Sequence, residues 1–149
     1  MRILSVIYIF SLMAAVQCTG QQLETITSIE FTKQTRGYLD KIKISKDSVQ
    51  GMVENHRASE KSRQYASRID QDGWARLLLS LNDVSLKDVD GLQSPTMARA
   101  HDGAVHSSIL ITFENGQTIS HGFDDENPHP DLKPLLLAIL EYRTASDKQ

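Results

Sequence analysis

Side chains suited to acid–base or metal chemistry gather toward the C-terminal part of the chain. The chain has five histidines: His56, His101, His106, His121 and His129. No pair has the i, i+4 spacing of a zinc-protease helix. Asn115 and Gly116 form the dipeptide preferred in a tight type I′ hairpin turn. A hairpin symmetric about these two residues would place His106 opposite Asp125.

The open end of that hairpin is the best candidate for a metal-binding or acid–base site. His106 and Asp125 would face each other there, with Asp124, Glu126 and His129 near them. The alternative is a solvated hairpin end whose acidic side chains favour the N-terminus of the next helix. We favour this alternative, because no motif fixes the number or geometry of metal ligands. The sequence therefore predicts no catalytic residue, no metal site and no cofactor.

Other segments lack the motifs of known catalytic sites. Ser107, Ser108 and Ser120 lie in predicted strands without the Gly-x-Ser-x-Gly context of a hydrolase nucleophile. The segment FDDENPHPD lacks the glycine turn and alternating carboxylates of a calcium loop. The segment QTRGYLD has a single glycine, too few for a phosphate-binding loop. We therefore expect a protein that is not an enzyme.

Cys18 is the only cysteine, and an export signal precedes it. Arg2 is followed by an apolar run of about 14 residues, which suits a signal-peptide core and falls short of the ~20 residues of a membrane-spanning helix. Cleavage before Cys18 would leave a lipid-attachment cysteine; this resembles a bacterial lipoprotein signal, although Gln17 stands where a small residue is usual. Cleavage after Gly20 is the alternative. We expect an exported protein, lipid-anchored in the cell envelope or secreted, without a free thiol.

Composition indicates an acidic chain with one domain. Removal of residues 1–17 leaves 132 residues, enough for one domain with its own core. Arg2 is the only charged residue removed, so 15 basic side chains remain against 19 acidic ones, a net charge of −4. The basic residues are scattered along the sequence. Nucleic-acid binding is not expected, because the phosphate backbone requires a basic patch.

Hydrophobic periodicity predicts six strands and two helices. Alternation with a period of two indicates strands, and apolar residues at i, i+3, i+4 and i+7 indicate helices. The predicted strands lie within residues 28–33, 38–45, 48–55, 62–69 and the two arms of 104–123, and the helices within 70–82 and 130–143. The order β-β-β-β-α-β-β-α favours an α+β fold, with an antiparallel sheet and both helices on one face as a two-layer sandwich. We expect a signal peptide at 1–17 (or 1–20), a tether at 18–28, the domain at 29–143 and a frayed tail at 144–149.

Capping residues refine the expected start of the last helix. His129 or Asn127 could cap it, with Pro130 or Pro128 at the first helical position. Pro134 would break a backbone hydrogen bond if the helix began that early. The regular helix is therefore expected to begin only near Pro134.

Three blocks in order give the chain a family resemblance. They are IEFTKQTRGYLDKIKIS, DGAVHSSILITFENGQTISHGFDD and PHPDLKPLLLAILEY. Together they span Ile29 to Tyr142, and the pattern resembles that of small bacterial domains whose functionally described branch is the emfourin-type inhibitors of thermolysin-like metalloproteases. The resemblance implies the same fold and a possible inhibitor activity, and it transfers no inhibitory residue. The chain is equally similar to small exported lipoproteins of Bacteroidota-like bacteria.

These observations predict a non-enzymatic binding module that engages another protein. Exposed loops at residues 34–38 and 93–102 would provide the contact surface, because loops on a rigid sheet commonly carry binding. The candidate partner-binding side chains are Arg36, Tyr38, Met97 and Arg99. Contact with a membrane is expected only through the lipid anchor. The alternatives are an inhibitor of an extracytoplasmic metalloprotease and a small metal-binding or enzymatic domain built on His106 and Asp125.

Overall fold

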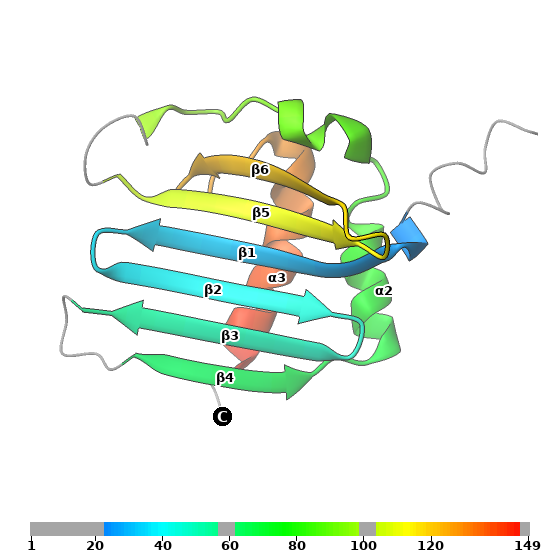
Figure 1. Cartoon of the computed structure of the whole chain (residues 1–149), viewed down its shortest axis with the longest axis horizontal. Helices are drawn as coiled ribbons and strands as arrows, with labels where there is room; N and C mark the ends of the chain where they lie inside the picture. Colours follow the sequence, from blue (N-terminus) through cyan, green and yellow to red (C-terminus); the bar gives the residue numbers. More distant parts are fainter. Residues whose placement is uncertain (1–22, 57–61, 99–103, 147–149) are drawn as a thin grey trace, which may run out of the picture.

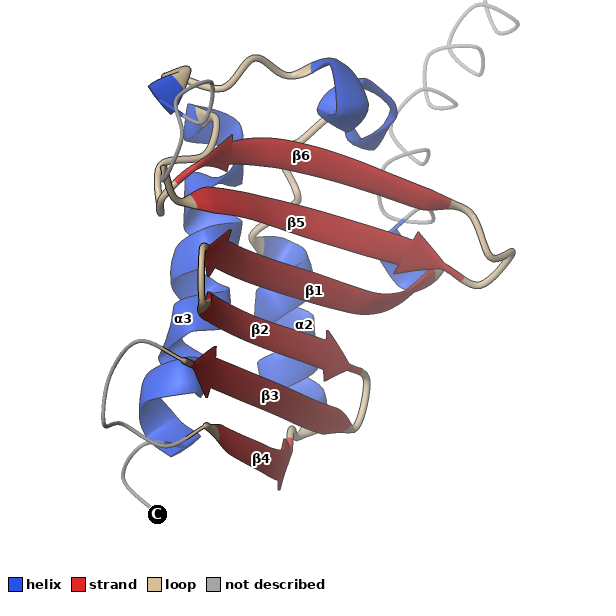
Figure 2. Ribbon diagram, turned by 60° about the vertical axis from the view of Figure 1, so that its left-hand side comes forward, coloured by secondary structure: helices blue, strands red, loops and turns tan. Residues whose placement is uncertain are grey.

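A six-stranded antiparallel sheet forms the centre of the protein, and helices lie against one of its faces (Figures 1 and 2). The computed structural model describes residues 23–56, 62–98 and 104–146. The strands are β1 (Ile26–Thr35), β2 (Tyr38–Ser45), β3 (Ser48–Asn55), β4 (Arg63–Arg68), β5 (His106–Phe113) and β6 (Thr118–Asp124). Their order in the sheet is β4-β3-β2-β1-β5-β6. The predicted α+β class is confirmed.

Two α-helices of the described chain, α2 (Gln71–Leu79) and α3 (Lys133–Ser146), occupy the same side of the sheet. Asp70 caps α2, and its Oδ1 accepts the Gly73 backbone N–H at 2.7 Å. His129 caps the short 3-10 turn η3 (Pro130–Leu132) that leads into α3, as one of the two expected capping residues. The α-helix then begins at Lys133, so Pro134 lies in its first turn, where its missing N–H breaks no hydrogen bond.

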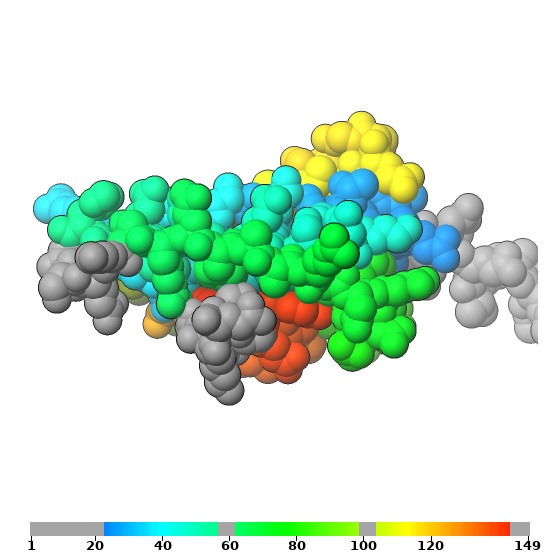
Figure 3. Space-filling model, turned by 90° about the horizontal axis from the view of Figure 1, so that it is seen from below, coloured from blue at the N-terminus to red at the C-terminus, as the bar shows by residue number. Residues whose placement is uncertain are grey.

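The core fills the space between the sheet and the helices. Alternate strand residues point toward the helices, and the helical stripes meet them. Fully or almost fully buried side chains from both layers include Ile29, Phe31, Ile42, Ile44, Ile109, Ile111, Trp74, Leu77, Leu135, Leu136 and Ile139. In Figure 3 the strands form one layer, with α3 in red and α2 in green on its lower side. We call the side toward the helices the inner face of the sheet and the opposite side the outer face.

Both ends of the domain extend beyond the expected bounds. β1 begins at Ile26, and Leu23 and Ile26 are buried in the core, so part of the expected tether belongs to the domain. At the other end α3 continues to Ser146, inside the expected tail. The signal segment at 1–17 and Cys18 lie outside the described residues.

The β5–β6 hairpin forms as expected, but its turn is one residue longer. Phe113 and Gln117 close a three-residue loop, because the Phe113 N–H donates to the Gln117 carbonyl at 2.9 Å. Only Gly116 in this loop has a positive φ, of 80°, whereas a type I′ turn needs two such residues. The loop is thus the three-residue kind with glycine in the left-handed conformation. His106 consequently pairs with Asp124, and the expected pairing with Asp125 is wrong.

Candidate functional site

In the observed register, the residues of the expected acid–base cluster at the open end of the hairpin do not form a single site. His106 is exposed and lies opposite Asp124. Asp124 is buried, and its Oδ2 accepts hydrogen bonds from the Thr96 hydroxyl at 2.5 Å and from the Ala98 N–H at 2.7 Å. This carboxylate therefore fastens the segment before residue 99 to the end of β6.

His129 belongs to a separate packing arrangement on the inner face. Its backbone N–H donates to Nε2 of His121 at 3.1 Å, and its ring meets that of His121 edge-on at 6.5 Å. His121 is buried and stacks on Phe123, with 5.5 Å between the ring centres. Within residues 23–56, 62–98 and 104–146, no group of three or more His, Cys, Asp or Glu side chains could hold a metal ion.

Asp125 and the neighbouring Glu126 instead join an ion-pair network on the inner face. Lys33 Nζ lies 2.6 Å from Asp125 Oδ1 and 3.1 Å from Glu126 Oε1. Arg143 of α3 donates to the same Glu126 oxygen at 3.2 Å and to Oδ2 of Asp40 at 3.0 Å. We call these five residues the inner-face network. It ties β1, β2 and the segment after β6 to the C-terminal half of α3.

The inner-face network holds Lys33 in its charged form. Burial lowers the pKa of the Lys33 ammonium, but hydrogen bonds and charge attraction from Asp125 and Glu126 outweigh burial and raise the pKa above its ordinary value. Ser107 lies beside Lys33 in the register, and its buried Oγ has no hydrogen-bond partner among the described residues. A serine–lysine nucleophile would need a neutral amine as its base, which this environment disfavours. The arrangement therefore suits structural support of α3 better than catalysis.

A sequence signal for this network was present in β2. Asp40 shares its strand face with Ile42 and Ile44, and the structure buries it to 2% exposure. A buried carboxylate on an apolar face requires a cationic or hydrogen-bonding partner. Arg143 continues the apolar stripe of the last helix, three residues after Leu140, and is that partner.

Three of the four expected partner-binding residues lie in segments at the same end of the sheet, the β1–β2 hairpin and the segment before residue 99, on the left in Figure 1. Arg36 and Tyr38 belong to the β1–β2 hairpin, and with His106 they line a small hollow of about 290 Å³. Met97 is 63% exposed, in the segment that Asp124 fastens beside His106. Burial and the nearby Asp40 charge raise the pKa of Tyr38. Arg99 lies outside the described residues.

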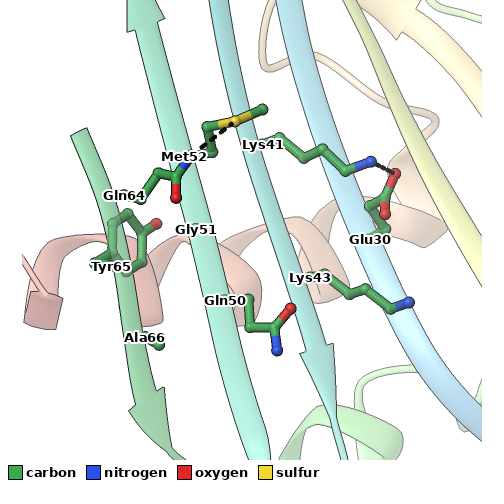
Figure 4. A pocket seen from close by; sticks show the side chains of 9 residues that line it. All are labelled: Glu30, Lys41, Lys43, Gln50, Gly51, Met52, Gln64, Tyr65 and Ala66. Atoms are coloured by element: carbon green, nitrogen blue, oxygen red, sulfur yellow. Dashed lines mark hydrogen bonds and ion pairs between the residues drawn. The ribbon is translucent and has the colours of Figure 1, made fainter. Parts of the chain in front are cut away.

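A larger hollow lies on the outer face of the sheet over β1 to β4 (Figure 4). Its volume is about 660 Å³, and it is lined by Glu30, Lys41, Lys43, Gln50, Gly51, Met52, Gln64, Tyr65 and Ala66. We call it the outer-face hollow. Lys41 Nζ forms an ion pair with Oε1 of Glu30 at 2.8 Å. No sequence motif marks these residues, although Lys41 and Lys43 stand on the polar side of β2.

No protein-family model matches the chain, and no curated protein matches it. None of the described helices is both long and apolar enough to cross a membrane. The site is therefore interpreted from its own geometry and charge.

Proposed function

We propose that this chain is a non-enzymatic binding domain that engages another protein through the outer face of its sheet. The observation that carries the proposal is that α2 and α3 both pack on the inner face, so neither covers the outer face. A two-layer sandwich with one open side presents a broad, rigid and polar surface. Rigid surfaces bind with little loss of conformational entropy, which favours recognition of a protein partner.

The chemistry of the outer face supports recognition better than catalysis. Its hollow offers ammonium, amide and thioether groups, from Lys43, Gln50 and Met52 among others. These groups form hydrogen bonds and apolar contacts, and none is a nucleophile with a neighbouring base. The β1–β2 turn with the exposed Arg36 borders the same sheet and would widen the contact surface, whereas Tyr38 shares the strand face of Asp40 on the inner side.

The proposal also includes export and attachment through Cys18. The apolar run before this residue supports export, and its position after a signal core supports lipid attachment. Mass spectrometry of the mature N-terminus tests this part. A diacylglyceryl-modified Cys18 is expected, whereas a chain that begins at Gln21 would replace the anchor with secretion.

Protease inhibition is a second candidate, favoured by the tight β1–β2 hairpin. Thr35 pairs directly with Tyr38, and the Gly37 carbonyl accepts the His56 N–H at 2.9 Å, so the exposed Arg36 stands on a braced turn. An inhibitor needs such a rigid projecting segment to fill a cleft. Titration of thermolysin with the chain tests the idea, and full protease activity at a stoichiometric excess would exclude it for that enzyme.

Site-specific photocrosslinking tests the proposed binding face. A photoreactive phenylalanine analogue replaces Gln64 in the outer-face hollow or, as a matched control, the 57% exposed Leu137 on the helix layer. After irradiation of intact cells we expect a discrete protein adduct from position 64 and none from position 137. An adduct only from position 137, or from neither, would contradict binding through the outer face.

A further inference from the structure

Two rows of side chains cross the outer face from β1 to β4, beneath the outer-face hollow (Figure 4). By register, one row is Glu30, Lys43, Gln50 and Ala66, and the next is Thr32, Lys41, Met52 and Gln64. A second hollow of about 300 Å³ adjoins the first and shares Lys43 and Gln50 with it. The two hollows make one trough around Lys43.

The trough has one more ammonium than carboxylate. Glu30 stands opposite Lys43 across the strands, yet its Oε1 pairs with Lys41 at 2.8 Å. In Figure 4 the Lys43 ammonium lies away from that pair. Lys43 is exposed and has no ion pair within the described part of the chain. The trough therefore offers one unneutralised positive charge to a ligand.

One amide lies beside this charge, and a second lies farther along the trough. Gln50 is the cross-strand neighbour of Lys43 and shares both hollows with it. Gln64 directs its Nε2 to the Met52 sulfur at 3.8 Å, which leaves its carbonyl oxygen as an acceptor. An amide both donates and accepts hydrogen bonds, as a peptide backbone does. Four strands at a spacing of about 4.8 Å span about 14 Å, the length of about four residues of extended chain.

We infer that the trough binds a short extended acidic segment of the protein partner, with one carboxylate on Lys43 and backbone groups on Gln50 and Gln64. The inference rests on the proposed function and names the chemistry of its partner. A single excess charge beside Glu30 suits an isolated carboxylate. A densely charged polyanion would be repelled by Glu30 and by the net charge of −3 of the chain.

A peptide titration tests this recognition. The probes are the blocked peptides acetyl-Ser-Glu-Ser-Glu-Ser-amide and its counterpart with glutamine in place of glutamate. Binding to the isotope-labelled full chain in zwitterionic detergent is followed by amide chemical shifts. Variants are Lys43→Gln and, as a control of equal charge change, Lys87→Gln, whose lysine is exposed on η1 (Leu86–Gly91) beside the other edge strand, β6.

We expect the glutamate peptide to shift the amides of Gln50 and Gln64 and to bind about two- to five-fold tighter than the glutamine peptide, the range for an exposed ion pair. Lys43→Gln should remove that preference, and Lys87→Gln should keep it. Equal binding of both peptides, equal losses in both variants, or shifts confined to other surfaces would each overturn the inference.

Crosslinking distinguishes failure of acidic-peptide recognition from failure of the proposed function. If position 64 captures a partner and Lys43→Gln leaves the yield unchanged, the acidic recognition is wrong and the binding face stands. If position 64 captures nothing, the proposed function itself fails. A crosslinking yield at position 64 that falls with Lys43→Gln and persists with Lys87→Gln supports both the acidic recognition and the binding face.

Discussion

The two faces of the sheet each carry a lysine–carboxylate group, and the two groups differ in how they are neutralised. On the inner face, Lys33 and Arg143 pair with three carboxylates, those of Asp40, Asp125 and Glu126, at N···O distances of 3.2 Å or less. On the outer face, the single carboxylate, Glu30, pairs with Lys41 and leaves the Lys43 ammonium without an ion pair among the described residues. Every charged side chain of the inner-face network has an ion-pair partner in the chain, whereas the outer group keeps one charge available.

Burial explains why this difference matters. Asp40 is 2% exposed, so its charge must be paired for the fold to be stable. Lys41 is 40% exposed, and water screens its pairing with Glu30. A charge on the inner face therefore supports the fold, and a charge on the outer face is free to serve recognition. The predictions below test this division.

Arg143→Leu should have the largest effect. It leaves the buried Asp40 carboxylate without its cation and should lower the free energy of unfolding by about 3 kcal/mol, the lower end for a broken buried pair because Arg143 is itself partly exposed. Urea denaturation measures the change. Lys133→Leu on the same helix removes an exposed cation and should stay within about 0.5 kcal/mol of the parent protein.

A double variant identifies the cause. Asp40→Asn combined with Arg143→Leu removes the buried charge as well as its partner, so it should be more stable than Arg143→Leu alone. If the two substitutions simply add, the inner-face network is not a coupled ion pair.

Gly51→Ala should have the next largest effect. A Cβ at Gly51 would lie 1.8 Å from Cζ of Tyr65, whose ring packs over this residue. The ring must move, at a cost of about 1–3 kcal/mol for overpacking. Gly122→Ala is the matched control, because its Cβ would meet nothing within 4 Å. Thermal unfolding compares them, and equal losses would show that the close approach at Gly51 is unimportant.

The sequence was sufficient to predict the class of fold, because periods of two and 3.6 mark strands and helices independently of distant contacts. The hairpin at Gly116 was also predicted, but its register was wrong by one residue. Ile109 and Ile111 must share a face with Phe123, which only the observed three-residue loop allows. The shared apolar face of these three residues therefore predicts the observed register.

The sites were harder to predict than the fold. A carboxylate such as Asp40 can be recognised as misplaced from its strand face, but its partner Arg143 lies 103 residues away and is fixed only by the docking of α3. The unpaired charge in the outer-face hollow depends on which lysine forms the ion pair with Glu30. Its cross-strand neighbour is Lys43, yet it pairs with Lys41 through side-chain rotamers that strand periodicity does not specify.

High pH should weaken the inner face selectively. The folded-state pKa of Lys33 is raised above 10.5, so its stabilisation is present below that pH and is lost as the pH rises through the folded-state pKa. In Lys33→Arg the charge persists at higher pH. The parent protein should therefore lose stability relative to Lys33→Arg only above about pH 10.5.

Denaturation at a series of pH values measures that difference. Tyr38, whose pKa is also raised, loses its contribution in the same direction, but it is present in both proteins and cancels in the comparison. Lysine remains charged at about pH 6 to 9. A difference in unfolding free energy between the two proteins that changes within this range would contradict the assignment to Lys33.

Lys41→Met should have the smallest effect on stability and a distinct effect on binding. Loss of the exposed pair with Glu30 should cost less than about 1 kcal/mol. It also releases Glu30, whose cross-strand neighbour is Lys43, to neutralise that ammonium. The preference for the glutamate peptide should then fall although Lys43 is unchanged. Lys46→Met, in the β2–β3 turn, is the control and should keep the preference. If Lys41→Met instead lowers the free energy of unfolding by about 3 kcal/mol, the outer pair has the same structural role as the inner-face network. Only the loss of a partner of a buried charge lowers stability by that much.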